Sequence, residues 1–206
     1  MLWGAPSGEL ELRREGDGST RLRGRFPYGR PAVLSDGGRR GRPRKEIIGR
    51  RAFAYRVESP DEDIHLLVGH DYDRPLASRG TGTLDLEDTD DALLLAARIT
   101  PDVASTAFGR DALALLNQGL ARGLSPGFRL PPARAVPPEQ AERIEEEPNA
   151  PERGMHGAII RTVLSALLYE LSIVTRPAYP EAQVEARRWE PDARPPRARR
   201  AAYRWR

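Results

Sequence analysis

The chain has 206 residues and a mass of 22.9 kDa, enough for one domain with a buried core. Hydrophobic residues make up 39% and charged residues 31%, and the formal net charge is only +3, so the charge balance alone does not indicate a nucleic-acid-binding protein. No run approaches the ~20 apolar residues of a membrane-spanning helix, and the absence of cysteine excludes disulfides, thiolate nucleophiles and cysteine-ligated zinc within the chain.

The first residues lack a positively charged segment followed by an apolar one, so we expect no secretory signal.

The pattern of apolar residues predicts mostly β-structure. Segments in which apolar and polar residues alternate, or in which an apolar run ends at turn residues, are typical of strands; they lie at residues 9–13, 21–26, 52–57, 64–68, 83–86, 92–99 and 171–175. Residues 83–86 and 92–99 flank an acidic turn and are predicted to form a hairpin. The apolar residues from 159 onward leave room for a further strand before the last one.

One helix is predicted after this hairpin. Apolar side chains recur there at helical spacing, with an acidic residue near the start and glycines near the end; the residues are Ala112, Leu113, Leu115, Leu116 and Leu120, with Asp111, Gly119 and Gly123. Many short strands with one or two helices indicate a mainly β fold with helices (α+β), either a barrel or a sandwich with helical additions.

The chain is predicted to hold one domain and a tail. Residues 1–186 carry the apolar patterns, with a loop at 131–156 that is rich in proline and glutamate. Residues 187–206 contain eight arginines against Glu190 and Asp192 and show no apolar periodicity, so we expect a disordered basic tail. A second basic run lies at residues 39–45.

Ser125 is the first candidate for a chemical role. Residues 123–127 read Gly-Leu-Ser-Pro-Gly and match the Gly-x-Ser-x-Gly nucleophile elbow of α/β-hydrolases. That elbow needs a strand before the serine and an N–H on the next residue, whereas here a helix comes first and Pro126 has no N–H, so the α/β-hydrolase fold is excluded. Two interpretations of Ser125 remain: a nucleophile on another scaffold, made extended by Pro126, or part of a turn after the helix.

His70 and Glu170 are the candidates for proton transfer. His70 follows an apolar strand, where an imidazole either acts as a general base or lies half-exposed and bonded to a neighbour. Glu170 lies in an apolar segment, where a carboxylate is costly unless it is paired. It orients an imidazole, faces outward from an alternating strand, or forms an ion pair with Arg161 or Arg176.

A metal site is the weaker interpretation of the histidines. His65 and His70 are five residues apart, so on a regular strand they point to opposite faces and do not converge with Asp71 and Asp73. The sequence also has no His-Glu-x-x-His motif. We expect no metal and no other cofactor.

The candidate residues occur in the order of a known family. From about residue 20 to 186 the chain resembles tailed-phage prohead proteases, most specifically in a serine segment and in a Glu-x-Ser-x-Val…Pro-Ala…Pro segment; the matching stretches are 49–53, 70–76, 80–84, 119–128 and 168–182. By position in these motifs, His70 is similar to the family's histidine, Ser125 to its serine and Glu170 to the acidic residue of its last motif. The chain departs from the pattern at Pro126, where the family commonly has an apolar residue with an N–H, and at Tyr179, where asparagine is common.

The resemblance implies a fold and a mechanism. The family is similar to herpesvirus assemblin, which implies an antiparallel β-barrel ringed by helices and a serine protease in which the histidine precedes the serine. Ser125 would attack a peptide carbonyl while His70 takes its proton and returns it to the leaving amine, and Glu170 would hold the imidazole tautomer. Because Pro126 has no N–H, the oxyanion donors would be other backbone N–H groups, a water or an arginine.

The resemblance also implies partners. The expected substrates are the scaffolding protein, or the scaffolding segment of the major capsid protein, and the protease itself, inside an immature capsid (prohead) in the host cytoplasm. A homo-oligomer within the prohead is expected, with no membrane and no nucleic-acid partner. Two other classes stay open: a non-catalytic capsid-assembly or scaffolding protein with the same fold, and a basic nucleic-acid-binding protein that uses residues 39–45 and the tail.

Overall fold

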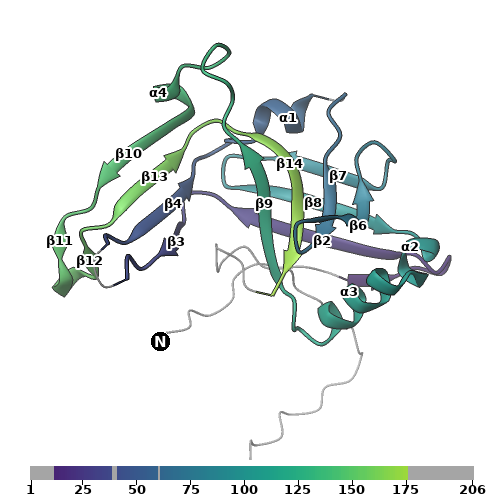
Figure 1. Ribbon diagram of the computed structural model, residues 1–206. Coiled ribbons are helices and arrows are strands. Elements are labelled where there is room, and N and C mark those ends of the chain that lie inside the picture. Colours follow the sequence, from purple (N-terminus) through teal and green to yellow (C-terminus); the bar gives the residue numbers. More distant parts are fainter. Residues whose placement is uncertain (1–11, 39–40, 60, 176–206) are drawn as a thin grey trace, which may run out of the picture.

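The computed structural model describes residues 12–38, 41–59 and 61–175, which form a mainly β fold with a few short helices. This confirms the predicted α+β class. Three four-stranded sheets contain most of the described strands (Figure 1). We call them the N-terminal sheet, the central sheet and the arm sheet.

The N-terminal sheet is antiparallel throughout. Its order is β1 (Leu12–Arg14), β2 (Thr20–Pro27), β8 (Ala92–Ile99) and β7 (Leu84–Asp88). Side chains alternate along β2, so that Leu22 and Phe26 are buried while Arg21 and Arg23 are exposed, as the sequence pattern predicts. The pairing of β7 with β8 confirms the predicted hairpin.

The central sheet contains the segments with the candidate residues. Its order is β6 (Asp71–Ser78), β5 (His65–Val68), β14 (Leu167–Val174) and β9 (Gly123–Arg129). β5 and β14 are parallel, and the other pairs are antiparallel. The strand predicted at 64–68 is therefore confirmed, and the one predicted at 171–175 begins earlier, at residue 167.

The arm sheet extends away from the other two sheets, to the left in Figure 1. Its order is β10 (Glu142–Glu146), β13 (Ile159–Val163), β4 (Arg44–Ile48) and β3 (Pro31–Ser35), and a short ribbon of β11 (Asn149–Ala150) and β12 (Met155–His156) lies at its end. The segment 131–156, predicted as a loop, thus contributes an edge strand. Backbone pairing of β10 with β13 and the ion pair of Arg161 with Glu142 explain why a segment rich in proline and glutamate is ordered here.

The helices are short and lie at the margins of the sheets. They are α1 (Ala54–Glu58), α2 (Pro101–Ser105), α3 (Ala107–Asn117) and α4 (Pro138–Ala141), with a 3-10 turn at Pro151–Arg153. The predicted helix corresponds to α3, which begins before Asp111 because the Thr106 hydroxyl caps it by accepting a hydrogen bond from the Gly109 N–H over 3.0 Å. Among the described residues no helix combines the length and the apolar character needed to cross a membrane.

The strand predicted at 52–57 is wrong, because these residues contribute to α1 and the turn before it. Phe53 and Val57 are buried and the Val57 N–H donates to the Phe53 carbonyl over 3.1 Å, whereas Tyr55 between them is 65% exposed. Two buried residues four positions apart fit one face of a helix, while an alternating strand would bury Tyr55 as well. Burial in this segment follows the helical period rather than the period of a strand.

The expected closed barrel is not confirmed. Within the described residues the N-terminal sheet ends at β1 and β7 and the central sheet ends at β6 and β9, so each of these strands pairs on one side only. The sheets are also not purely antiparallel, since β5 with β14 and β13 with β4 run parallel. Packed apolar side chains rather than a continuous ring of backbone hydrogen bonds join the two sheets, through one core cluster that contains Leu22, Leu95, Leu124 and Leu171.

An aromatic cluster joins the elements around β9. Phe53 lies 6.4 Å from Phe26, 6.1 Å from Tyr28 and 5.7 Å from Phe128, measured between ring centroids. These rings come from β2, the bend that follows it, the turn before α1, and β9, so they anchor the strand that carries Ser125 to the rest of the core.

The tail predicted at 187–206 lies outside the described residues. The strand predicted at 9–13 does so in part, since the described chain begins with β1 at Leu12. The limit between domain and tail at residue 186 stays a prediction.

Candidate active site

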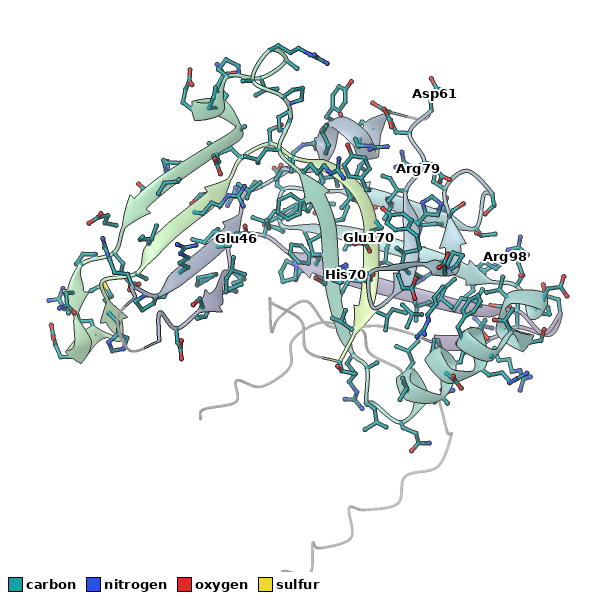
Figure 2. The ribbon with its side chains drawn as sticks, viewed as in Figure 1. Glu46, Asp61, His70, Arg79, Arg98 and Glu170 are labelled. Carbon is teal, nitrogen blue, oxygen red and sulfur yellow. The ribbon has the colours of Figure 1, made fainter. Side chains whose placement is uncertain are left out.

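His70 lies in the turn that joins β5 to β6 (Figure 2). Gly69 and His70 both have left-handed backbone conformations, with φ of +65° and +62°. Glycine adopts this conformation freely, whereas histidine does so at a cost of about 1 kcal/mol or more. Two hydrogen bonds tie the turn to β14: the Gly69 N–H donates to the Ile173 carbonyl over 3.0 Å and the His70 N–H donates to Ser172 Oγ over 2.8 Å. They hold His70 in a conformation that it would otherwise avoid.

The imidazole of His70 contacts the carboxylate of Glu170. His70 Nδ1 lies 2.7 Å from Glu170 Oε1, and the two side chains differ sharply in exposure, 45% for His70 and 4% for Glu170. A buried carboxylate needs hydrogen-bond donors, and Ser172 provides a second one by donating its hydroxyl to Oε2 over 2.7 Å. A proton on Nδ1 is thus held by Glu170, which leaves Nε2 free to accept another.

This contact decides among the three interpretations of Glu170. Arg161 contacts Glu46 at 3.1 Å and Glu142 at 2.6 Å instead, and Arg176 lies outside the described residues. Glu170 is 3% exposed, so it does not face outward from its strand. The paired, imidazole-bound interpretation is the one that the geometry supports.

Gly127 makes room for this carboxylate. It lies directly opposite Glu170 in the pairing of β9 with β14. A Cβ at Gly127 would lie 2.6 Å from Glu170 Cδ and 2.9 Å from its Cγ, and closer still to Oε1. The glycine is therefore required because the Glu170 side chain lies against the β9 backbone, not because of an unusual φ.

Ser125 lies on the same side of the central sheet as this pair. It is half-buried in β9, directly opposite Ser172, and two residues from Gly127. Side chains two residues apart on a strand share a face, and directly opposed residues bring their Cβ atoms to about 5 Å, so the Ser125 hydroxyl projects beside the group formed by Ser172, Glu170 and His70. It forms no hydrogen bond with another described residue. β9 is a strand, so Ser125 is extended, as Pro126 predicted, and the turn interpretation is not observed.

Aromatic and basic side chains border the site beyond Glu170. Partial burial raises the pKa of Tyr72, and the negative charge of Glu170 adds to the rise. The guanidinium groups of Arg56 and Arg129 lie 4.3 Å and 5.6 Å from the centre of the Tyr169 ring. Positive charge thus lies near one end of the site.

The remaining candidates have other partners, although His65 lies opposite Glu170 in the pairing of β5 with β14. His65 contacts Asp63 at 3.4 Å and the Tyr72 ring, and no group of three or more His, Asp or Glu side chains in the described ranges could hold a metal ion. In the basic run, Arg42 pairs with Glu146 at 2.9 Å and Lys45 pairs with Glu147. These two cations are thus already neutralised within the chain, which argues against a nucleic-acid site there.

Sequence reasoning missed the supporting residues Ser172 and Gly127. Both lie inside the segments that carry the resemblance, Glu-x-Ser and Gly-x-Ser-Pro-Gly, but composition and spacing alone do not separate a structural serine or glycine from a turn residue.

Comparison with known proteins agrees with the geometry. Residues 39–194 match the family described as caudovirus prohead serine protease, and this range includes His70, Ser125 and Glu170. No curated protein and no solved structure matches the chain. Because the match covers well over half of the 206 residues, the chain belongs to the caudovirus prohead serine protease family.

Proposed function

We propose that Ser125, His70 and Glu170 are the catalytic residues of this serine protease. The contact of 2.7 Å between His70 Nδ1 and Glu170 Oε1 carries the proposal, since it is the arrangement that fixes an imidazole as a general base. The position of Ser125 opposite Ser172, on the face that bears Glu170, supports its role as the nucleophile.

Each residue has one task in this mechanism. Ser125 Oγ attacks the peptide carbonyl while His70 Nε2 takes its proton, and the imidazolium then returns that proton to the leaving amine. Glu170 holds the Nδ1–H tautomer and stabilises the imidazolium. Water repeats the attack on the acyl-enzyme with His70 again as base, which restores Ser125.

The substrates follow from the role of the family in phage capsid maturation. We assign to the chain the cleavage of the scaffolding protein, or of the scaffolding segment of the major capsid protein, and of itself, as a homo-oligomer inside the prohead. The half-exposed His70 beside a strand-borne serine fits an extended peptide substrate, because such a chain can lie across β9 without entering a deep pocket.

Coexpression tests this function directly. The chain is produced together with the major capsid protein and the scaffolding protein of the same phage genome, and the masses of all products are measured. We expect cleavage products with the wild type and none with Ser125→Ala or His70→Gln. Ser105→Ala is the matched control and should give normal products, because Ser105 is an exposed serine on α2. Capsid assembly without any change in mass would instead favour a non-catalytic assembly protein.

An active-site probe tests the nucleophile without a known substrate. A fluorophosphonate reacts with an activated serine: an Oγ–P bond forms, the P–F bond breaks, fluoride leaves, and the serine proton passes to the base. Labelling of Ser125, located by mass spectrometry of peptides, is expected for the wild type and is lost in His70→Gln.

A further inference from the structure

We infer that Ser172 is the positioning residue of this site, because its hydroxyl binds both the backbone of His70 and the carboxylate of Glu170. The inference rests on the proposed catalytic roles of those two residues. Ser172 does not contact the substrate, since it is completely buried.

The hydroxyl of Ser172 uses its donor and one acceptor position at once. It donates to Glu170 Oε2 over 2.7 Å and accepts the His70 N–H over 2.8 Å. A hydroxyl has one proton to donate and two lone pairs, so both bonds are compatible in a single orientation.

These contacts close a ring of three hydrogen bonds. The ring runs from His70 Nδ1 to Glu170 Oε1, from Glu170 Oε2 to Ser172 Oγ, and from Ser172 Oγ to the His70 N–H. The imidazole is therefore held at its backbone and at its ring by groups on one strand, β14. Free rotation of either the histidine or the carboxylate breaks a bond of the ring.

The backbone contact has a further consequence for His70. Its φ of +62° is costly for a residue with a Cβ, and the hydrogen bond to Ser172 offsets that cost. The direction of the Cα–Cβ bond of His70 depends on φ. The hydrogen bond from the His70 N–H to Ser172 Oγ therefore helps to set where the imidazole points. Without the hydroxyl, the His70 N–H and the buried Glu170 Oε2 each lose a hydrogen-bond partner.

The central experiment compares Ser172→Ala with a matched control, Ser19→Ala. Ser19 is 1% exposed and its hydroxyl also donates to a carboxylate, Asp17 Oδ1, over 2.6 Å, but in the turn between β1 and β2. We expect Ser172→Ala to slow fluorophosphonate labelling of Ser125 at least about tenfold, because removing one partner leaves buried polar groups unsatisfied. Ser19→Ala should label within about twofold of the wild type.

The tautomer of His70 gives a readout that a purely structural role would not move. The chain has three histidines, so the ¹⁵N signals of His70 are assigned by their absence in His70→Gln. The wild type should show one tautomer with the proton on Nδ1, and Ser172→Ala a mixture of the two. Ser172→Thr keeps the hydroxyl and should restore most of the labelling rate and the single tautomer.

The outcomes separate this inference from the proposed function. The positioning role of Ser172 is overturned if Ser172→Ala is labelled at a rate within twofold of the wild type. It is also overturned if labelling is slower but the tautomer of His70 is unchanged. If the wild type is not labelled at Ser125, the proposed function fails, and the tautomer measurement still decides whether Ser172 orients His70. Should Ser172→Ala not fold, Ser172→Cys is the second variant, because its thiol fills the space but forms only weak hydrogen bonds, and the same losses are expected.

Discussion

Substitution of Gly127 by alanine tests whether the carboxylate of Glu170 must lie against β9. The added Cβ would lie 2.6 Å from Glu170 Cδ, and ordinary contact begins at 3.4 Å, so Cδ has to move by about 0.8 Å and Oε1 by more. Oε1 already lies 2.7 Å from His70 Nδ1 in a side chain that is only 4% exposed. The carboxylate cannot make room without losing its alignment with the imidazole.

The expected result is a large loss of activity. A misplacement of about 1 Å in a catalytic group costs on the order of a hundredfold, so we expect Gly127→Ala to slow fluorophosphonate labelling of Ser125 by about that factor. Gly16→Ala is the matched control, because nothing lies within 4 Å of a Cβ at Gly16 and its φ is not left-handed. Thermal unfolding followed by circular dichroism verifies that both variants are folded.

A double substitution identifies the cause of the loss. If the Cβ acts by displacing Glu170, then Gly127→Ala has little further effect once Glu170→Ala has removed the side chain that it meets. An equal loss from Gly127→Ala in both backgrounds would refute the reasoning, and so would wild-type labelling of the single variant.

The remaining functional predictions concern the nucleophile, the carboxylate and the tail. Ser125→Ala should lower the cleavage rate by roughly a millionfold with an unchanged melting temperature; detectable processing by a folded variant would exclude Ser125 as nucleophile. Glu170→Gln should slow labelling of Ser125 without abolishing it, and a folded variant that labels at the wild-type rate would remove Glu170 from the proposed triad. Truncation after Ala186 should preserve labelling but lower the number of copies of the protease per prohead, counted by mass spectrometry. The reason is that the arginines of 187–206 stay charged and can tether the protease to an acidic surface of scaffold or capsid protein. Unchanged copy numbers would reject this tethering role of the tail.

The parts of the structure that the sequence predicted are those with a strong local signal. Strand β2 alternates in polarity, β8 is an apolar run that follows an acidic turn, and α3 shows helical spacing. His70 and Glu170 were singled out by a histidine at a strand end and a carboxylate in an apolar segment, and their contact gives both a partner. Their pairing came from the resemblance, because two residues a hundred positions apart carry no local signal of contact.

The parts that were missed depend on tertiary contacts. Residues 52–57 fit an alternating strand as well as a helix, and the burial of Phe53 and Val57 against the core decides for the helix. β10 is strand only because β13 lies beside it. The role of Ser172 is likewise invisible in the sequence, since it depends on which turn comes to lie against β14.

The last prediction concerns the pH dependence of stability at the aromatic cluster that anchors β9. Asp88 is 8% exposed, and its Oδ1 accepts the Tyr28 hydroxyl over 2.6 Å. Burial raises the pKa of Asp88 above its ordinary 3.8, although the Tyr28 hydrogen bond, the charge of Arg51 and the Phe53 backbone N–H oppose the rise. Folding therefore disfavours the ionised form of Asp88 relative to the unfolded chain.

The sign of the effect follows from proton uptake. Between pH 3.8 and the raised pKa, the folded chain binds more protons at Asp88 than the unfolded chain, so the contribution of Asp88 to stability falls as pH rises through this window and is then constant. Asp88→Asn cannot ionise, so the free energy of unfolding of the wild type minus that of the variant should decrease from about pH 3.5 upward, measured by urea denaturation. Tyr28→Phe removes the opposing hydrogen bond and should extend the decrease to higher pH. A difference that stays flat or increases with pH would show that Asp88 is better solvated than its burial implies.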